Sequence, residues 1–365
     1  MPELDTLSGL ALQQTFVHES PRIRVTFSAG ALGSVRAEAK ALGLARLLVV
    51  STPEQRDLAD RVAGLLNGLA AGVHPHARMH VPVPVAQAAV AEATRLGADG
   101  LVAVGGGSTI GLAKAIALES GLPIIAIPTT YAGSEMTSVW GLTEDGAKRT
   151  GRDERVRPAT VVYDPELTAS LPVPVAVSSG LNALAHAAEA LYAPDRSPVV
   201  SLMAEEGARA LISALPRLVA DGSAAKARAA ALYGAWLCGT CLGATTMSLH
   251  HKLCHVLGGT FDLPHAQTHA VVLPHVLAFN LPHAPAAAAA LSRATGAADP
   301  AHALWEFGIR LGSPASLAAL GMPATDVEIA VERAVAAPYA NPVQPTAEDI
   351  RGLLRRAVDG APPRA

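Results

Sequence analysis

The sequence predicts an α/β domain with a parallel sheet, followed by an all-helical domain. Short apolar runs, such as residues 47–50 and 101–104, alternate with amphipathic stretches throughout the first half. After residue 163 this strand pattern fades and helical spacing takes over. The length of 365 residues suits two domains of ordinary size.

The first half reads as alternating strands and helices. Strands are expected at residues 23–27, 47–50, 79–83, 101–104, 123–127 and 161–163. Helices are expected between them at residues 31–42, 54–66, 85–96 and 109–119. Near-continuous β-branched runs separated by helices are typical of a parallel sheet that is covered on both faces.

The second half reads as helices alone. They are expected at residues 173–192, 198–220, 224–249, 284–295, 301–311 and 346–358. The pairs Asp164-Pro165 and Leu171-Pro172 punctuate the chain between the two patterns. We therefore place an α/β domain at residues 1–165 and a helical domain at residues 166–365.

Composition excludes several classes of protein. Hydrophobic residues make up 50% of the chain and charged residues 16%, which is too apolar for a disordered protein. A net charge of -3 and 4% aromatic residues argue against a nucleic-acid partner. The uncharged stretch 229–249 is long enough to span a bilayer, but its many Gly, Thr and Ser residues favour a buried helix over a membrane segment.

The cysteines and the N-terminus indicate a cytoplasmic protein. Residues 1–5 contain no basic segment and no apolar core of a secretory signal. An odd number of cysteines (Cys238, Cys241 and Cys254) argues against a disulfide framework. Cys238 and Cys241 have the C-x-x-C spacing, but they lie inside an expected helix, so we interpret them as packing residues.

A glycine-rich turn is the first candidate binding site. It consists of Gly105, Gly106, Gly107 and Ser108, which follow a buried strand and open a helix. Glycine allows close approach of the backbone to a ligand, and the N–H groups at a helix start favour an anion. We expect a dinucleotide diphosphate here. An ordinary tight turn is the alternative, because neither G-x-G-x-x-G nor the Walker pattern is present.

A second turn follows the next strand, at the edge where open α/β sheets bind ligands. Its hydroxyl-bearing residues are Thr129, Thr130, Tyr131 and Ser134. We expect the threonines and the serine to bind the cofactor and Tyr131 to contact the substrate. Ser51 and Thr52 end an early strand, at a position where a carboxylate would repel a 2′-phosphate. Their lack of charge predicts use of both NADH and NADPH.

A histidine cluster is the candidate reaction centre. Six of the 13 histidines fall between residues 250 and 275. His251 and His255 are four residues apart and share a helix face, and so do Asn182 and His186. His265 follows a proline on an expected turn and can fold back toward them. Two helices and a turn thus aim these side chains at one point.

Imidazoles in such a group suit a divalent metal. The group contains no carboxylate, however, and Asn182 offers only a neutral amide oxygen. A core residue with satisfied hydrogen bonds is the alternative for any single histidine. We expect that role for His250, His269 and His275.

Together these features resemble the iron-containing alcohol dehydrogenase family. The glycine turn, residues 128–134, and the spacing His251-x3-His255-x9-His265 carry the resemblance, which covers nearly the whole chain. Residues 127–136, 179–192, 232–238 and 248–252 are most similar to the maleylacetate reductase branch of that family.

The resemblance implies a dehydroquinate synthase-like fold with the active site in a cleft between the two domains. It places the family's metal-ligand positions on Asn182, His186, His251 and His265. Metal-dependent members carry Asp at the first position, whereas Asn is the pattern of the reductase branch. The expectation is therefore a set of vestigial ligands and no metal requirement.

The implied reaction is NAD(P)H-dependent reduction of the carbon–carbon double bond of maleylacetate to 3-oxoadipate, in bacterial breakdown of aromatic compounds, by a cytoplasmic homodimer. Hydride addition creates an enolate that hydrogen-bond donors stabilise. We expect donors in His186, His251, His265 and Lys252, with the unligated histidines protonated. Together with Asn182 they would bind the dianion, and His255 would lie near the nicotinamide or relay a proton.

Two alternatives stay open. The first is a metal-dependent alcohol or polyol dehydrogenase of the same fold, which would contain stoichiometric iron or zinc. The second is a non-catalytic dinucleotide-binding sensor, which would oxidise NADH with no unsaturated oxo acid or aldehyde. The dense polar cluster argues against the sensor.

Overall fold

A computed structural model describes residues 16–144 and 147–364 of the chain. The residues divide into two compact units. The sheet unit contains residues 21–171 and 223–232, and the helical unit contains residues 16–20, 172–222 and 233–364. Residues 1–5, for which we expected no secretory signal, lie outside the described part.

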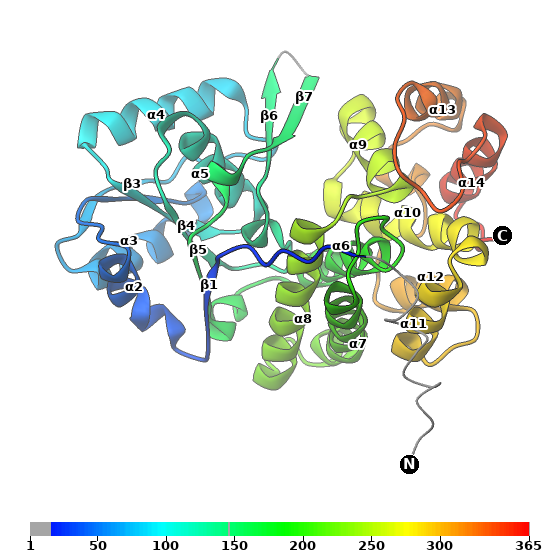
Figure 1. The fold of residues 1–365 in the computed structure, drawn as a ribbon, viewed down its shortest axis with the longest axis horizontal. Coiled ribbons are helices and arrows are strands. Elements are labelled where there is room, and N and C mark those ends of the chain that lie inside the picture. Colours follow the sequence, from blue (N-terminus) through cyan, green and yellow to red (C-terminus); the bar gives the residue numbers. More distant parts are fainter. Residues whose placement is uncertain (1–15, 145–146, 365) are drawn as a thin grey trace. The chain divides into compact units, whose positions relative to one another are not determined.

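The sheet unit is built on six parallel strands in the order β1-β8-β5-β4-β2-β3 (Figure 1). The strands are β1 (Arg24–Phe27), β2 (Leu47–Val50), β3 (Ala70–His74), β4 (Gly100–Gly105), β5 (Ile124–Pro128) and β8 (Thr160–Tyr163). A separate hairpin pairs β6 (Val139–Glu144) with β7 (Ala147–Arg152). The predicted parallel sheet is confirmed.

Helices cover both faces of this sheet, which explains the continuous apolar runs. The helices of the unit are η2 (Ala31–Ser34), α2 (Val35–Ala41), η3 (Pro53–Gln55), α3 (Arg56–Leu66), α4 (Val83–Leu96), α5 (Gly107–Ser120), η4 (Ser134–Met136), η5 (Glu154–Val156) and η6 (Pro165–Thr168). Val49, Val102 and Ile125 point to one face and pack with α2 and α3. Successive strand residues alternate between faces, so the neighbours of these residues face α4 and α5 instead.

Two expectations for strands in this unit were wrong. Residues 79–83 form a turn with positive φ at His80 and Val81, followed by a single bridge from Pro82 to Thr143. Pro82 lacks the N–H group that a strand needs and stands at the N-cap of α4, so α4 begins at Val83 where the strand was expected to end. The edge strand β3 was missed, because its sequence of small residues has little β-propensity.

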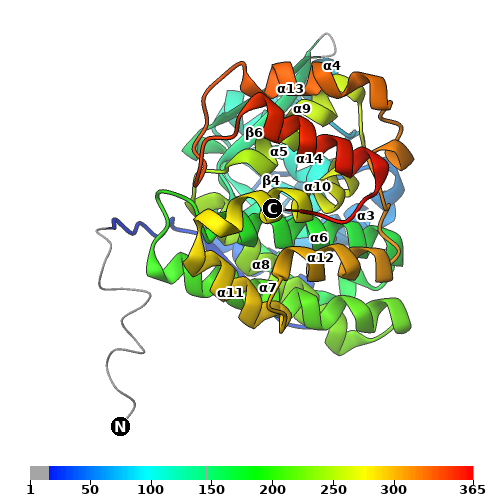
Figure 2. The same ribbon diagram turned by 90° about the vertical axis from the view of Figure 1, so that its right-hand side faces the viewer.

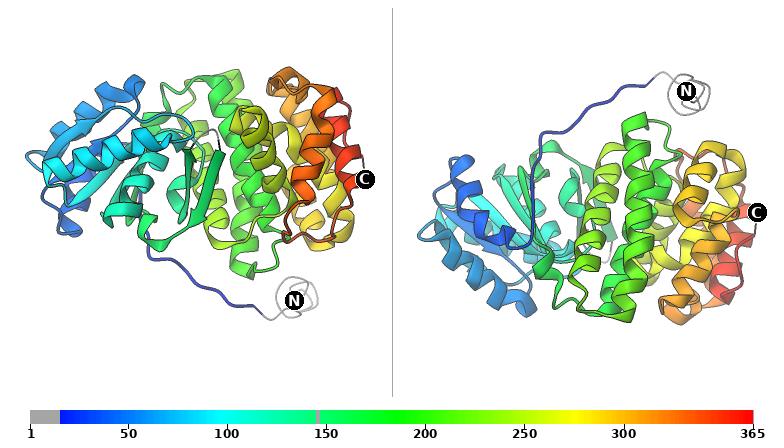
Figure 3. Two further views of the ribbon diagram at one scale, coloured as in Figure 1. Left: turned by 90° about the horizontal axis from the view of Figure 1, so that it is seen from above. Right: turned by 90° about the horizontal axis from the view of Figure 1, so that it is seen from below.

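The helical unit contains only helices and connections within its described residues, as predicted; it is green to red in Figure 3. Its elements are α6 (Val173–Ala190), α7 (Pro198–Ala220), α8 (Ala225–Ala244), α9 (Leu249–Phe261), α10 (His265–Asn280), η7 (Leu281–His283), α11 (Pro285–Thr295), α12 (Pro300–Arg310), η8 (Ala318–Leu320), η9 (Ala324–Asp326), α13 (Val327–Val335) and α14 (Ala347–Asp359). The first residues of α8 belong to the sheet unit. Among the described residues, every helix is too short or too polar to cross a lipid bilayer.

The single helix expected at residues 224–249 was wrong, because α8 ends at Ala244 and α9 begins at Leu249. Residues 245–248 are non-helical, and carboxylates from outside α8 and α9 bind their backbone. Asp195 accepts hydrogen bonds from the backbone N–H of Thr246 at 3.0 Å, and Glu189 accepts one from that of Ser248 at 3.1 Å. The histidines therefore lie on a separate helix, whose start is fixed by a side chain distant in sequence.

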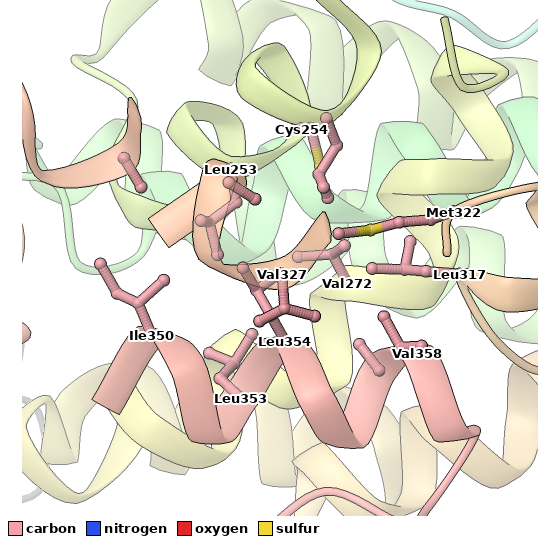
Figure 4. Close-up of a cluster of buried hydrophobic side chains, with 14 of the residues drawn as sticks. Leu253, Cys254, Val272, Leu317, Met322, Val327, Ile350, Leu353, Leu354 and Val358 are labelled. Atoms are coloured by element: carbon pink, nitrogen blue, oxygen red, sulfur yellow. The ribbon is translucent and has the colours of Figure 1, made fainter. Parts of the chain in front are cut away.

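An apolar core anchors α9 to its neighbouring helices (Figure 4). Leu253 and Cys254 of α9 pack with Val272 of α10, with Val327 of α13, and with residues of α14 such as Leu354. Figure 2 shows α13 and α14 side by side over this core. The histidines of α9 are thus held by a packed apolar layer.

Candidate active site

The glycine turn lies between β4 and α5. Gly105 has a φ of +154°, and a Cβ there would lie 2.3 Å from the Thr109 hydroxyl. Gly107 opens α5 and is exposed. Only glycine fits such a close turn, and the first N–H groups of α5 have no partner within the helix. The turn therefore presents a positive helix end.

The second turn packs directly against the first. The backbone N–H of Thr129 donates to the Gly105 carbonyl at 3.2 Å, and a Cβ on Gly106 would lie 2.8 Å from the Thr130 methyl group. Gln55, which the sequence analysis missed, donates to the Thr129 hydroxyl at 2.7 Å. The structure thus brings together the two turns that the sequence analysis singled out separately.

Other predicted residues of the sheet unit are less accessible. Ser108, Thr130, Ser134 and Thr52 are half-buried, whereas Ser51 is fully buried. The Ser51 hydroxyl donates to the Thr52 carbonyl at 3.0 Å. Tyr131 is fully buried near Thr168 and Arg228, and burial raises its pKa. Contact between Tyr131 and the substrate stays a prediction.

The helical unit assembles the predicted histidines from three helices. His186 of α6 lies 5.2 Å from His251 of α9 between ring centroids. His251 lies 6.2 Å from His255, and His255 stacks on His265 at 6.4 Å. His265 is the first residue of α10 rather than part of a turn. Lys252 is half-buried on α9, and Asn182 is buried on α6.

His269 and His250 belong to the same cluster, although we expected them to be separate core residues. The His269 ring lies 4.3 Å from that of His265 and 4.8 Å from those of His250 and His251. Because His265 begins a helix, His269 is one turn farther along the same face. The expected turn at His265 concealed this spacing.

Glu189 organises the cluster and was missed from the sequence. This fully buried carboxylate accepts hydrogen bonds from the backbone N–H groups of His250 at 2.8 Å and Ser248 at 3.1 Å, at the start of α9. It also bonds His251 Nδ1 at 2.6 Å. Its position three residues after His186, on the same face of α6, was the available signal.

Burial keeps several of these imidazoles neutral. It lowers the pKa of His251 to about 3 and that of His250 to about 4. Burial and the neighbouring imidazoles also lower the pKa values of His186 and His269 well below the usual value. These directions favour neutral His186 and His251, opposite to the protonated form that was expected. Burial raises the pKa of Glu189, and the backbone N–H donors oppose that rise.

Several buried polar atoms of the cluster histidines and of Asn182 have no hydrogen-bond partner among the residues that the structure describes. They are Asn182 Oδ1, His186 Nδ1, His250 Nδ1 and both ring nitrogens of His269. Nitrogens of His250, His251 and His269 lie within 4.8 Å of one another, in an arrangement that could hold a metal. Only His251 among them is a predicted ligand position. The predicted set of Asn182, His186, His251 and His265 contains no carboxylate.

Of the three cysteines, Cys254 contacts the cluster, with its Sγ 3.6 Å from His250 Nε2. Cys238, Cys241 and Cys254 are free and buried, and burial raises the pKa of each thiol. The Cys241 thiol approaches the Val200 carbonyl at 3.5 Å, and Cys238 packs close to Gly207. They are packing residues, as the helix context predicted.

Two family models match the chain. Residues 21–165 match "Iron-containing alcohol dehydrogenase", and residues 176–358 match "Fe-containing alcohol dehydrogenase family, C-terminal". The two matches meet near the start of α6 and together cover most of the sequence.

Individual relatives are similar over nearly their full length. A maleylacetate reductase of Burkholderia cepacia is 57% identical over 95% of this chain and 99% of its own. The crystal structure of maleylacetate reductase from Rhizobium sp. strain MTP-10005 superposes with a TM-score of 0.93, at 51% identity, over 96% of this chain and all of the other. That of maleylacetate reductase from Agrobacterium tumefaciens gives 0.93 at 52% identity, with the same coverage.

Proposed function

This chain belongs to the iron-containing alcohol dehydrogenase family, and we propose that it catalyses NAD(P)H-dependent reduction of maleylacetate to 3-oxoadipate. Hydride passes from the nicotinamide to the carbon β to the ketone, and a proton reaches the α carbon. The observation that carries the proposal is the histidine cluster of α6, α9 and α10, together with Asn182 of α6, where metal-dependent members of the family would carry Asp. The identity with reductases over nearly the whole chain supports it.

We place the cofactor at the two turns of the sheet unit. The diphosphate would lie on the N–H groups of Gly106, Gly107 and Ser108 at the start of α5. The hydroxyls of Thr130 and Ser134 would contact the ribose or phosphate, while Thr129 would be held by Gln55. No carboxylate stands at Ser51 or Thr52, so both NADH and NADPH would bind.

We place the substrate at the histidine cluster of the helical unit. Maleylacetate is a dianion, and it meets the Lys252 ammonium and the positive N-terminal end of α10, where His265 lies. Donors there would stabilise the enolate that forms when hydride adds. Asn182 and His186 would provide further polar contacts.

The Glu189–His251 pair supplies a route for the proton. We assign the proton of this 2.6 Å contact to His251 Nδ1, which then donates to the Glu189 carboxylate and leaves the lone pair on Nε2. Nε2 can then accept a proton from solvent and pass it to the α carbon, while the Glu189 carboxylate stabilises the transient imidazolium. His255, which is exposed beside His251, would connect the pair with solvent.

We also propose that the reaction needs no metal. A metal in this family would supply charge stabilisation at the ketone oxygen. The residues at the ligand positions offer an amide instead of a carboxylate, and the described nitrogens that lie closest together are not that set. The proposed enolate stabilisation therefore rests on the protein's own donors.

Two further features complete the proposal. The chain would act as a homodimer, as is usual in the family. It would work in the cytoplasm, where NADH is available; its three cysteines are all unpaired, which fits a reducing compartment.

Spectrophotometry tests the proposal. Purified protein is mixed with maleylacetate and either NADH or NADPH, and cofactor oxidation and 3-oxoadipate are measured. We expect turnover with both cofactors, with kcat/KM values that differ by less than about a hundredfold. Activity only with alcohols or aldehydes would instead favour a metal-dependent alcohol dehydrogenase. Absence of oxidation across a panel of oxo acids and aldehydes would favour a binding protein.

A further inference from the structure

Lys114 is a buried charge that the proposed mechanism does not use. It lies on α5, seven residues after Gly107, and is 1% exposed. Its Nζ donates to the Ser134 carbonyl at 2.7 Å, the Thr137 hydroxyl at 2.8 Å and the Val139 carbonyl at 2.8 Å. An ammonium has three N–H groups, so each has an acceptor.

All three acceptors belong to the loop that follows β5, residues 129–139. The Thr137 hydroxyl donates in turn to the Ser134 carbonyl at 3.1 Å, and the Ser134 hydroxyl lies 3.3 Å from Nζ. Lys114 of α5 thus holds both the η4 turn and the first residue of β6 through hydrogen bonds. The ends of the loop are also held by the backbone: Thr129 N–H donates to the Gly105 carbonyl at 3.2 Å, and Asp153 N–H donates to the Ser138 carbonyl at 3.0 Å. Between these ends, Lys114 supplies the contacts to Ser134 and Thr137.

Stability alone does not account for an ammonium at this position. Burial lowers the pKa of Lys114 to about 7, although the charge of Glu135 opposes the change. Replacing a buried charge with a well-packed apolar side chain is often neutral or stabilising. A charge that is kept in the interior therefore points to a requirement for one particular loop conformation.

The same helix touches both proposed cofactor turns. The N-terminus of α5 forms the glycine turn, and Lys114 holds the loop whose Thr130 packs on Gly106. We propose that Lys114 is a positioning residue for NAD(P)H binding, which fixes residues 129–139 so that the hydroxyls of Thr130 and Ser134 face the cofactor. This inference rests on the proposed cofactor site.

Lys114→Met tests the inference, because it keeps the length of the side chain and removes all three donors. We expect the NADH Kd, measured by fluorescence titration, to rise about tenfold. Because the histidine cluster is untouched, the KM for maleylacetate at saturating NADH should change by less than about twofold. Amide exchange of residues 129–139 should become faster. Val62→Ala, in the buried core of the same unit, is the control: it should lower Tm and leave the NADH Kd unchanged.

Thr137→Val provides a second variant if Lys114→Met does not fold. It removes one acceptor and keeps the charge, so the NADH Kd should rise about threefold. NADH affinity within about twofold of wild type in every folded variant of the pair would overturn the inference. Gly106→Ala separates this failure from a wrong cofactor site. If it weakens NADH binding while the Lys114 and Thr137 variants do not, only the role of Lys114 is wrong; if it has no effect, the cofactor site is wrong too.

Discussion

Two of the buried polar centres in the described part of the chain are built in opposite ways. Around Lys114 in the sheet unit, one charge meets an acceptor for each of its N–H groups. In the helical unit, His250 Nδ1 and both ring nitrogens of His269 are fully buried and have no hydrogen-bond partner among the described residues. A buried polar group whose hydrogen bonds are all satisfied fixes one conformation of its surroundings. Buried polar atoms without partners can instead form hydrogen bonds with a bound ligand. We interpret the first centre as part of the scaffold and the second as the place of reaction.

Removing imidazoles from the second centre should have the largest effect. We expect His251→Ala and His265→Ala each to lower kcat at least about tenfold, because each removes a group that acts on the substrate. The NADH Kd should stay nearly unchanged, since the cofactor turns lie in the other unit. His275→Ala on α10 is the control: a buried histidine that is not in the cluster should leave kcat within about twofold. Full turnover in both cluster variants would disprove the assignment.

Glu189→Gln should come next, because it affects both the proton route and the start of α9. The amide cannot accept all the hydrogen bonds that the carboxylate accepts, so kcat should fall about tenfold and Tm should also fall. Asp299→Ala is the matched control, since it removes a helix cap of α12 in the same unit. It should lower Tm and leave kcat unchanged. If kcat were the same in both variants, Glu189 would act only as a cap for the start of α9 and not in the proton route.

Gly106→Ala should weaken NADH binding with little effect on the helical unit. The added Cβ would lie 2.8 Å from the Thr130 methyl group and push the two turns apart. We expect the NADH Kd to rise about fivefold, as measured by fluorescence titration. Gly64→Ala is the control, because a Cβ on Gly64 in α3 meets nothing within 4 Å. An unchanged Kd for Gly106→Ala would contradict the proposed diphosphate site.

His269→Leu tests whether the unpartnered nitrogens of the histidine cluster lower the stability of the fold. It should have the smallest effect of these substitutions. Leucine fills a similar volume and removes two unpartnered ring nitrogens, so the free energy of unfolding should rise by about 1 kcal/mol. Activity should fall at the same time, since functional sites often reduce stability. Denaturant unfolding and kcat are measured on the same preparation. A clear loss of stability would mean that His269 has a structural partner, such as ordered water.

Local patterns were predictable from the sequence, and contacts between distant segments were not. The glycine turn follows from one strand, one helix start and residues 105–108. The pairing of His251 with Glu189 joins residues 62 positions apart, and no periodicity indicates it. The break at residues 245–248 depends on the same carboxylate, so the helix appeared continuous in sequence. His269 was missed for a related reason, because the expected turn at His265 hid the helical spacing.

The central claim is that the histidine cluster serves the substrate rather than a metal. Its most direct test is kcat for maleylacetate after exhaustive treatment with a chelator, with iron and zinc in the same sample determined by elemental analysis. We predict full activity with far less than one metal ion per chain. Stoichiometric iron or zinc, together with activity that is lost to the chelator and restored by the metal, would contradict the claim.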